Sequence, residues 1–213
     1  MPLRTWIDEQ VRIVSGRHGL SAETVRQTQR GRLLEAAARL TAERGYRGMT
    51  AAELTKRAGV SRSTLYELFD SRDGCFYTAA REAHEHLVER LYEVASSEQP
   101  TREQIDQMIE TFMAFCADHP NAAQLVLLGV AGSGHEGGRL RSEWLDDMTE
   151  RFRGPLEARY VDPPRMTAEM LVGGLWHVAG SRIRADRAAE LPLLGRVLSA
   201  YMLRDLTERE ISG

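Results

Sequence analysis

The sequence predicts an all-α fold of about nine helices. Apolar residues recur at three- and four-residue spacing along most of the chain, and helix-capping residues stand before several of these stretches. Apart from a weak run over residues 11–14, no segment alternates apolar and polar residues as a strand would. At 213 residues, 42% of them hydrophobic, the chain is long enough to bury a sizeable core without disulfides or a structural metal.

The first two helices have clear start and stop signals. A long helix is predicted over residues 24–44, because its apolar spacing stops at Arg44, a cation in the last turn, followed by Gly45. Thr50 and Glu53 then form a capping box, in which each side chain accepts a hydrogen bond from the other residue's amide. A second helix is therefore expected to begin at Thr50.

A glycine turn joins the second helix to a third. Gly59 ends the second helix early, and Ser61 can cap a third helix that runs to Phe69. Apolar residues of the two helices face each other, which leaves outward-pointing side chains on the third helix, namely Arg62, Ser63, Tyr66 and Glu67. This arrangement is typical of a helix-turn-helix, whose second helix enters the major groove of DNA. The alternative is a generic helical hairpin.

The rest of the chain predicts further helices. Ser71 can cap one, Thr101 starts another with a capping box, and Pro120 can occupy the first turn of a third. The glycine-rich stretch 129–138 is predicted to break the helical pattern as a flexible connector. Beyond it an apolar stripe repeats every fourth residue, made of Trp144, Met148, Phe152, Leu156 and Tyr160.

Charge divides the chain into two parts. Residues 1–75 hold 13 Lys and Arg against 9 Asp and Glu, a balance of +4, and residues 76–213 hold 15 against 22, a balance of −7. The division predicts a basic module for a polyanion over residues 1–75, with an N-terminal extension at 1–23, and an acidic module of different function over 76–213. Chance scatter of surface charge is the alternative.

Cysteine usage and hydropathy favour a reduced, cytoplasmic compartment. Cys75 and Cys116 stand far apart without a C-x-x-C pair, so neither a disulfide framework nor a four-ligand zinc site is predicted. No apolar run reaches the roughly 20 residues needed to cross a bilayer. The N-terminus shows no apolar export segment, so we expect no membrane partner.

No catalytic or metal site can be named from the sequence. The stretch 129–138 lacks the preceding strand and the following Gly-Lys-Ser/Thr of a phosphate-binding loop. His84 and His86 lie on different helix faces, and with His135 they are expected at the surface or in loops rather than as zinc ligands. No Gly-x-Ser-x-Gly elbow is present. The sequence therefore predicts no enzyme, no cofactor and no metal.

The region from Leu33 to Arg72 resembles the N-terminal domain of TetR-family transcriptional regulators. The resemblance lies in Leu33-Leu34-Glu35-Ala36-Ala37, Ala58-Gly59-Val60-Ser61, Thr64-Leu65-Tyr66 and Phe69 followed by Ser71-Arg72. It implies a three-helix helix-turn-helix DNA-binding domain over residues 1–75 and a helical ligand-binding and dimerisation domain over residues 76–213.

The same resemblance implies the DNA contacts. They fall on Thr50, Ser61, Arg62, Ser63, Thr64, Tyr66 and Arg72. Thr50, Tyr66 and Arg72 would bind backbone phosphates, and Arg62 is the side chain expected to read a base edge. Glu67 departs from the family pattern. Because a carboxylate repels phosphates, we expect it to turn to solvent, pair with a nearby arginine or read a cytosine amino group.

Aromatic and methionine side chains of the C-terminal part are either ordinary core or the lining of an apolar cavity. They are Met108, Phe112, Phe115, Trp144, Met148, Met170 and Trp176, with His177 or His119 as a polar anchor. The resemblance further implies a homodimer. Its expected interface residues are Gly173 and Gly180, which would let a helix approach closely, and the stripe Leu194, Val197, Leu198 and Tyr201.

These features indicate a sequence-specific DNA-binding regulator, a repressor released from a palindromic operator by a small, mostly apolar ligand of unknown identity. Two alternatives remain open: a helical ligand-binding protein without operator activity, and a DNA-binding regulator without an effector. For the N-terminal extension, with Trp6 and Ile7, the sequence allows a short helix packed on the body, an arm near DNA or a disordered start.

Overall fold

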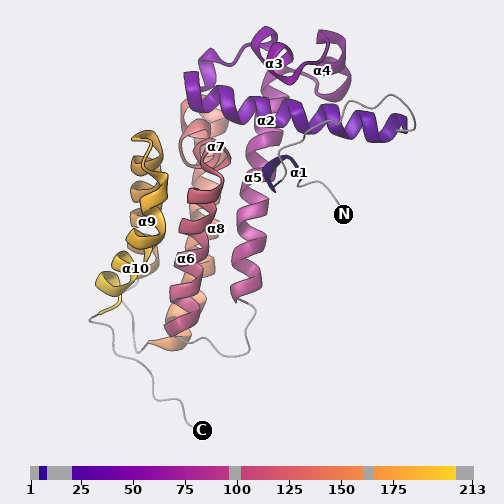
Figure 1. Ribbon diagram of the computed structural model, residues 1–213. Coiled ribbons are helices and arrows are strands. Elements are labelled where there is room, and N and C mark those ends of the chain that lie inside the picture. The colour runs from indigo at the N-terminus through magenta and orange to yellow at the C-terminus, as the bar shows by residue number, and fades with distance from the viewer. Residues whose placement is uncertain (1–4, 9–20, 96–101, 161–165, 205–213) are drawn as a thin grey trace.

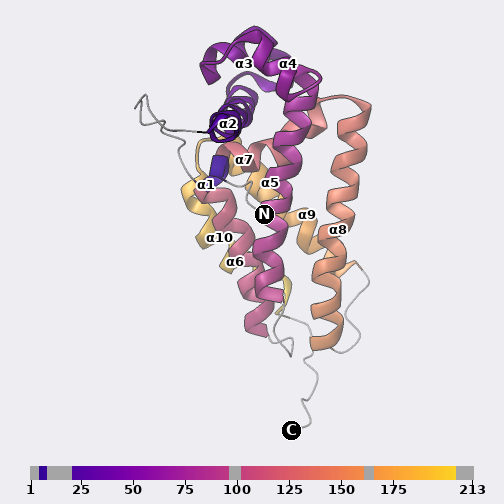
Figure 2. The same cartoon turned by 90° about the vertical axis from the view of Figure 1, so that its right-hand side faces the viewer.

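The computed structural model describes residues 5–8, 21–95, 102–160 and 166–204. These residues form ten α-helices with short π- and 3₁₀-helical segments, and no strand occurs among them. Helix α2 (Ala22–Gly48) lies across the top of the molecule with α3 (Ala51–Ala58) and α4 (Arg62–Leu68) above it (Figure 1). The longer of the remaining helices hang below as an elongated bundle (Figure 2). The all-α prediction is confirmed.

The three helices at the top all begin at a hydroxyl side chain. In each case the oxygen accepts a hydrogen bond from the amide three residues later: Ser21 from Thr24 at 3.1 Å, Thr50 from Glu53 at 3.2 Å, and Ser61 from Thr64 at 3.0 Å. The predicted caps at positions 50 and 61 are confirmed, and Ser21 caps α2, which begins at Ala22, two residues before the predicted boundary of 24. The glycine stop is also present, because Gly45 leaves helical geometry at φ 69°.

Helix α5 (Arg72–Ala95) leads from this top layer into the bundle, followed by α6 (Arg102–Asp118) and α7 (Pro120–Gln124). Ser71 caps α5 as predicted, since its Oγ accepts from the Gly74 amide at 2.9 Å. Pro120 occupies the first position of α7, where its missing N–H costs nothing. Thr101, the predicted cap of α6, lies outside the described residues.

The stretch predicted as a flexible connector is mostly helical. A π-helix, η1 (Leu125–Gly129), runs into a 3₁₀ turn, η2 (Val130–Gly132), and α8 (His135–Arg159) begins soon after. The chain leaves helical geometry only around Ser133 and Gly134. The prediction of a break over 129–138 is therefore wrong for most of its length, because tertiary packing overrides the weak helix propensity of glycine.

Close packing explains one of these glycines. Gly137 lies in the first turn of α8, and a methyl group there would come within 1.9 Å of the Val130 carbonyl oxygen and 2.0 Å of Ser133 Oγ. The Tyr77 hydroxyl of α5 donates to the Ser133 carbonyl at 3.3 Å. The glycine therefore permits a tight contact between the start of α8 and the preceding turn.

The bundle is completed by α9 (Thr167–Arg184), a 3₁₀ turn η3 (Ala188–Glu190) and α10 (Leu191–Met202). The stripe on α8 that repeats every fourth residue is buried as predicted, from Trp144 to Tyr160. Helix α10 packs on α6 and α9. Among the described helices, none is long and apolar enough to cross a membrane.

A four-residue helix, α1 (Thr5–Asp8), packs on the body of the protein. Trp6 is buried, and its indole N–H donates to Oε2 of Glu82 on α5 at 2.9 Å. The other oxygen of that carboxylate pairs with Arg30 of α2. Of the three possibilities for the N-terminal extension, this contact favours packing on the body; Val11 and Val14 lie outside the described residues.

The prediction that His84 and His86 are surface or loop residues is wrong. Both are buried on α5, because α2, α6, η1 and α8 surround that helix on more than one face. The His84 ring stacks on Trp144, with centroids 4.4 Å apart and planes 7° from parallel. Burial lowers the pKa of His84 to about 4, so the imidazole is neutral at pH 7.

Candidate nucleic-acid interface

The interface is built on two short helices with apolar facing sides. Leu54 of α3 and Leu65 of α4 are fully buried beside α2. Gly59 joins the helices in the left-handed conformation, φ 63° and ψ 42°, which glycine adopts without strain. The Arg32 guanidinium lies against this turn, so that a methyl group on Gly59 would come 2.7 Å from Nη2.

The predicted groove-facing side chains lie together at the start of α4. Ser61, Arg62, Ser63 and Tyr66 are exposed, and Thr64 is half-buried. The Arg62 guanidinium lies over the Tyr66 ring, 5.8 Å from its centroid. Arg62 has no hydrogen-bond or carboxylate partner among the described residues. The geometry leaves this arginine available to a base edge, and the contact itself stays a prediction.

The hydroxyl groups around it already have local partners. Ser61 Oγ lies 2.7 Å from Ser63 Oγ and 2.8 Å from Thr64 Oγ1, in addition to its capping bond. At the start of α3, Thr50 is exposed and its oxygen holds the Glu53 amide. The two bonds use two of the three hydroxyl protons of this cluster, which leaves one for a phosphate, whereas Thr50 only accepts and keeps its own proton for one.

Arg72 has an internal role that the sequence did not predict. Its Nη1 donates to the Met49 carbonyl at 3.0 Å, its Nε donates to Asp73 at 2.8 Å, and the guanidinium lies 4.6 Å from the Tyr46 ring centroid. The Tyr46 hydroxyl donates to Asp73 at 2.7 Å. Burial and this bond raise the pKa of Tyr46 to about 12. Arg72 therefore joins the end of α2 to the start of α5. Its side chain is half-buried, so only its exposed part could contact a phosphate.

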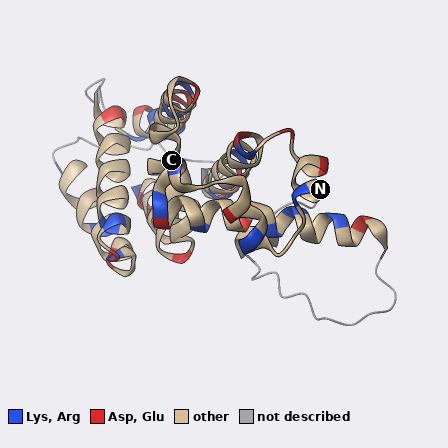
Figure 3. Ribbon diagram, turned by 90° about the horizontal axis from the view of Figure 1, so that it is seen from above, with Lys and Arg blue, Asp and Glu red and all other residues tan. Residues whose placement is uncertain are grey.

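Two further basic side chains accompany Arg62. Arg47 and Lys56 are exposed and, within the described part of the chain, have no carboxylate partner, whereas Arg57 donates to Glu43 at 2.8 Å. Acidic and basic residues alternate along the helices when the molecule is seen from this end (Figure 3). In the sequence, only the basic balance of residues 1–75 pointed to Arg47 and Lys56. Which basic residues remain without a carboxylate partner depends on the ion pairs of the folded protein.

Glu67 is exposed on α4, in agreement with the expectation that it turns to solvent. Arg26 approaches its backbone rather than its carboxylate, since Nη2 donates to the Glu67 carbonyl oxygen at 3.4 Å. No described arginine therefore neutralises the Glu67 carboxylate.

The proposed cavity residues separate into two groups. Met108, Phe112, Phe115, Trp144, Met148 and Trp176 are buried in one core, and Phe112 and Trp176 lie 6.4 Å apart between ring centroids. Met170 and His177 do not belong to this core, because both are exposed, Met170 at 55%. The inward face of α9 carries residues 171, 172, 175, 176 and 179, and helical phase turns positions 170 and 177 away from it. Among the named polar anchors, His177 is therefore excluded from the interior.

The predicted dimer residues also separate. Val197 and Tyr201 of α10 are exposed, at 58% and 64%, and Gly173 is exposed on α9 with open space around it. Leu194 and Leu198 are half-buried. Gly180 is buried within the same chain, where a methyl group would lie 3.1 Å from Leu128 Cδ2. Its close helix contact is with η1, so the expectation that it faces a second subunit is wrong.

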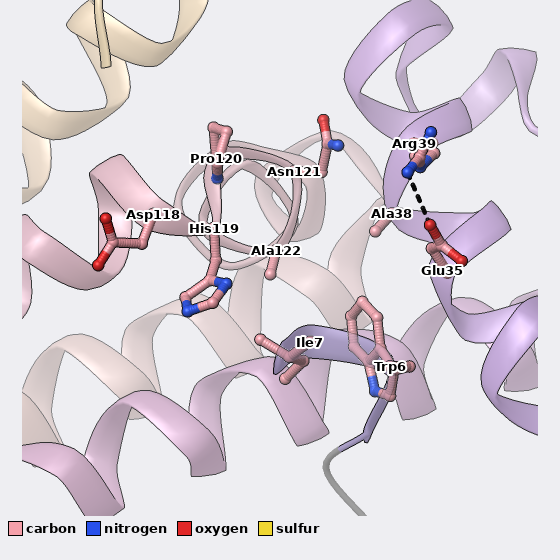
Figure 4. A pocket seen from close by; sticks show the side chains of 10 residues that line it. All are labelled: Trp6, Ile7, Glu35, Ala38, Arg39, Asp118, His119, Pro120, Asn121 and Ala122. Carbon is pink, nitrogen blue, oxygen red and sulfur yellow. Dashed lines mark ion pairs between the residues drawn. The ribbon is translucent and has the colours of Figure 1, made fainter. Parts of the chain in front are cut away.

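A cavity of about 280 Å³ lies where the top layer meets the bundle (Figure 4). Trp6 and Ile7 of α1 form one wall, and residues 118–122 form another. The third wall carries the Glu35–Arg39 ion pair of α2, 2.7 Å between charged atoms. Beside it, the Gln124 side chain of α7 donates to the Ala42 carbonyl of α2 at 3.2 Å. The junction between α2 and α7 is thus partly open.

The comparison with protein families decides the assignment. Residues 33–78 match the model of bacterial regulatory proteins of the tetR family, a segment that contains α3, α4 and the start of α5. Residues 33–78 are therefore a tetR-family segment of this chain. Arg62 lies within this segment, so the surface around it is the expected contact with DNA.

A curated relative supports the same assignment. The HTH-type transcriptional activator FasR of Mycolicibacterium smegmatis is 27% identical over 101 residues, which are 47% of this chain and 46% of FasR. The matched region thus spans less than half of that relative's length.

Solved structures share the fold over most of the chain. The transcriptional regulator FadR from Bacillus subtilis, determined in complex with stearoyl-CoA, superposes with a TM-score of 0.69 at 20% identity, over 80% of this chain and 96% of FadR. The fatty acid degradation regulator FadR from Bacillus halodurans gives 0.71 at 19% identity, over 85% and 97%. A TetR-like regulator from Rhodococcus sp. RHA1 gives 0.70 at 21%, over 84% and 97%. At these identities the likeness concerns the fold.

Proposed function

We propose that this protein is a homodimeric, ligand-responsive transcriptional regulator, with residues 1–75 on a palindromic DNA operator and residues 76–213 sensing and dimerising. It acts by binding rather than by catalysis. The observation that carries the proposal is the exposed polar row at the start of α4, held by its cap and centred on an unpaired Arg62. Selection of bound sequences from random DNA tests it directly. An inverted repeat with steeply salt-dependent affinity is expected, and recovery of no palindrome would contradict it.

Two arginines separate base reading from backbone contact. Arg62→Ala should cost about 1 to 3 kcal/mol on the selected site and relax one base position. Arg72→Ala should weaken binding to all sequences alike and lower the stability of the top layer, because it also removes the bonds to Met49 and Asp73. Titrations against the selected and a scrambled site distinguish the two. Equal losses on both sites for Arg62→Ala would remove its reading role.

Dimerisation is proposed through the exposed face of α9 and α10. Gly173, Val197 and Tyr201 contribute to this face, which one chain leaves uncovered. A bulky residue at Gly173 should weaken dimerisation and operator binding together. Sedimentation analysis checks this, and a wild-type monomer at micromolar concentration would contradict the proposal.

The effector is proposed to be a small, mostly apolar molecule bound in the core around Phe112, Trp144, Met148 and Trp176. That FadR from Bacillus subtilis was crystallised with stearoyl-CoA supports a fatty acyl compound. Such a ligand releases DNA only if it favours the conformation that does not bind the operator, and a shift from 1:99 to 99:1 needs about 5.5 kcal/mol of differential affinity. Helix α5 is the proposed link, because it begins next to α4 and runs into this core.

Reciprocity provides the test of this link. A saturating acyl compound should weaken operator binding, and operator DNA should weaken binding of the acyl compound by the same factor. A ligand that binds without changing operator affinity would leave a DNA-binding regulator without this switch. We propose repression as the direction of control; since FasR is described as an activator, a reporter assay with and without the gene decides the sign.

A further inference from the structure

A groove outside the buried core combines an apolar floor with basic side chains. It has a volume of about 200 Å³ and lies between α8, η1 and α9. Leu127, Leu128, Leu145 and Trp176 supply its apolar surface. Arg141, His177 and Arg184 line the same space, and none of its lining residues is acidic. The groove therefore offers positive charge beside apolar surface.

The charge in this groove is not neutralised within the chain. Arg141 and Arg184 have no ion-pair or hydrogen-bond partner among the described residues. Other arginines on α8 are paired: Arg139 with Glu143, and Arg151 with Asp147 at 2.8 Å. An arginine fork is suited to a carboxylate or phosphate, so two free guanidinium groups beside one small groove favour an anionic occupant.

The floor of the groove is fixed by packing. The Trp176 indole N–H donates to the Leu127 carbonyl at 3.2 Å, which uses the polar atom of the ring and leaves its apolar surface to the groove. Gly180 allows Leu128 to pack tightly on α9. Gly173 lines the groove and also contributes to the proposed dimer face, so the two sites adjoin at this residue. Gly174 faces Leu198 of α10, so the groove lies on the other side of α9, toward α8.

We propose that this groove binds the anionic end of an amphipathic molecule. Its carboxylate or phosphate would pair with Arg141 and Arg184, with His177 as a further donor, and its first methylene groups would lie on Leu127, Leu128 and Trp176. This inference rests on the proposed response to an effector and assigns the residues that recognise the charge. It also gives His177 a role at the surface rather than in the core.

The position of the groove connects it with the DNA-binding unit. Its floor residues Leu127 and Leu128 belong to η1, which packs against α2 as well as α9. Gln124, the residue before η1, holds the Ala42 carbonyl of α2. An occupant that displaces η1 would therefore act on α2 through a direct contact.

Calorimetry on the full-length protein without DNA tests the groove. Decanoate should bind at least about tenfold more tightly than the uncharged 1-decanol, because only the acid can pair with arginine. Arg141→Gln and Arg184→Gln should each weaken decanoate binding by about tenfold and leave 1-decanol binding unchanged. Arg139→Gln, on the same helix but paired with Glu143, is the matched control and should have no effect. Equal affinity for acid and alcohol, or no binding of either, would overturn the proposal.

A further comparison identifies the source of the anion. If the two arginine substitutions weaken binding of decanoyl-CoA, a phosphate occupies the site. If they weaken binding of decanoate alone, the site takes a free carboxylate. Sedimentation of the same variants tests whether the two arginines instead contact a second copy of the chain. Variants that dissociate the dimer and bind decanoate normally would show that these arginines serve a second copy of the chain, which contradicts the proposal.

Failure of the groove and failure of the proposed function are distinguishable. Arg62→Ala should weaken operator binding and keep decanoate binding. Decanoate that binds in an arginine-dependent manner but leaves operator affinity unchanged would retain the groove and remove the switch.

Discussion

The helix starts of the two parts of this molecule are built differently. Each helix start from α2 to α5 has a serine or threonine that accepts a hydrogen bond from the first turn, namely Ser21, Thr50, Ser61 and Ser71. The helices α7, α8, α9 and α10 begin without any side-chain cap. Local capping defines the helix starts of the proposed reading head for DNA, α2 to α4, whereas burial defines those of α7 to α10 in the proposed sensing bundle, which comprises α6 to α10. Capped starts fix the geometry of the surface that we propose contacts DNA.

The largest expected effect comes from a glycine in the sensing bundle. Gly137→Val should prevent folding of the bundle, because even a methyl group would overlap the Val130 carbonyl oxygen at 1.9 Å. Gly59→Ala in the reading head should lower the free energy of unfolding by only about 1 to 2 kcal/mol. Alanine would be strained in the left-handed conformation at this one position, and the nearest atom belongs to the movable Arg32 side chain. Circular dichroism and thermal unfolding of both variants measure this. Similar losses in the two variants would contradict the proposed difference between the parts.

The second effect concerns the aromatic core. Phe152→Ala should lower the free energy of unfolding by about 3 to 5 kcal/mol, because the ring is fully buried in α8 and its loss leaves a cavity. Urea unfolding gives the value. Tyr92→Ala is a suitable control, because that side chain is 65% exposed. Its free energy of unfolding should fall much less. A loss below about 1 kcal/mol for Phe152→Ala would show that the bundle collapses around the gap.

The third effect depends on pH. His84 has a folded pKa of about 4, below the ordinary value of 6.5, mainly because of burial. The unfolded chain binds more protons between these values, so stability is complete above pH 6.5 and falls as the pH is lowered toward 4, by up to about 3 kcal/mol. His84→Phe keeps a ring for Trp144 to stack on and should remove this pH dependence. Urea unfolding at pH 7 and pH 4.5 tests it, and an unchanged pH dependence in the variant would exclude His84 as its source.

The smallest effect concerns a single cap. Ser61→Ala should cost about 1 kcal/mol in stability, because the Thr64 amide loses its acceptor. It should also loosen the start of α4 and weaken operator binding. Ser142→Ala, an exposed serine within α8, is the matched control. An equal stability in the two variants would indicate that packing rather than capping holds α4.

The two parts also differ in how well the sequence predicted them. Thr50, Gly59 and Ser61 carry their structural role within a few neighbouring residues, so the reading head could be predicted nearly to the residue. Burial of His84 depends on helices far along the chain, and the fit of Gly137 depends on how the chain folds back on itself. Periodicity placed the stripe of α8 correctly. It failed for Met170 and His177, because hydrophobic type does not fix the inward face of a helix whose neighbours are unknown.

The site residues follow the same division. Sequence resemblance brought the polar row around Arg62 together, and the structure places those side chains on one surface. The internal role of Arg72 and the free state of Arg141 and Arg184 both depend on which carboxylates lie nearby. Ion pairing of that kind is a property of the folded surface, since the partners come from different helices or different turns of one helix.

The contacts at the upper end of α5 determine which movements this helix can make. Asp73 holds Tyr46 near the start of α5, and Glu82 holds both Trp6 and Arg30 farther along it. A roll of α5 about its own axis would pull both carboxylates away from their partners at once. The two contacts lie nine residues apart, about 13 Å along the helix axis, so a rigid tilt of α5 about one of them would break the other. Movement of its far end therefore requires α5 to bend beyond Glu82.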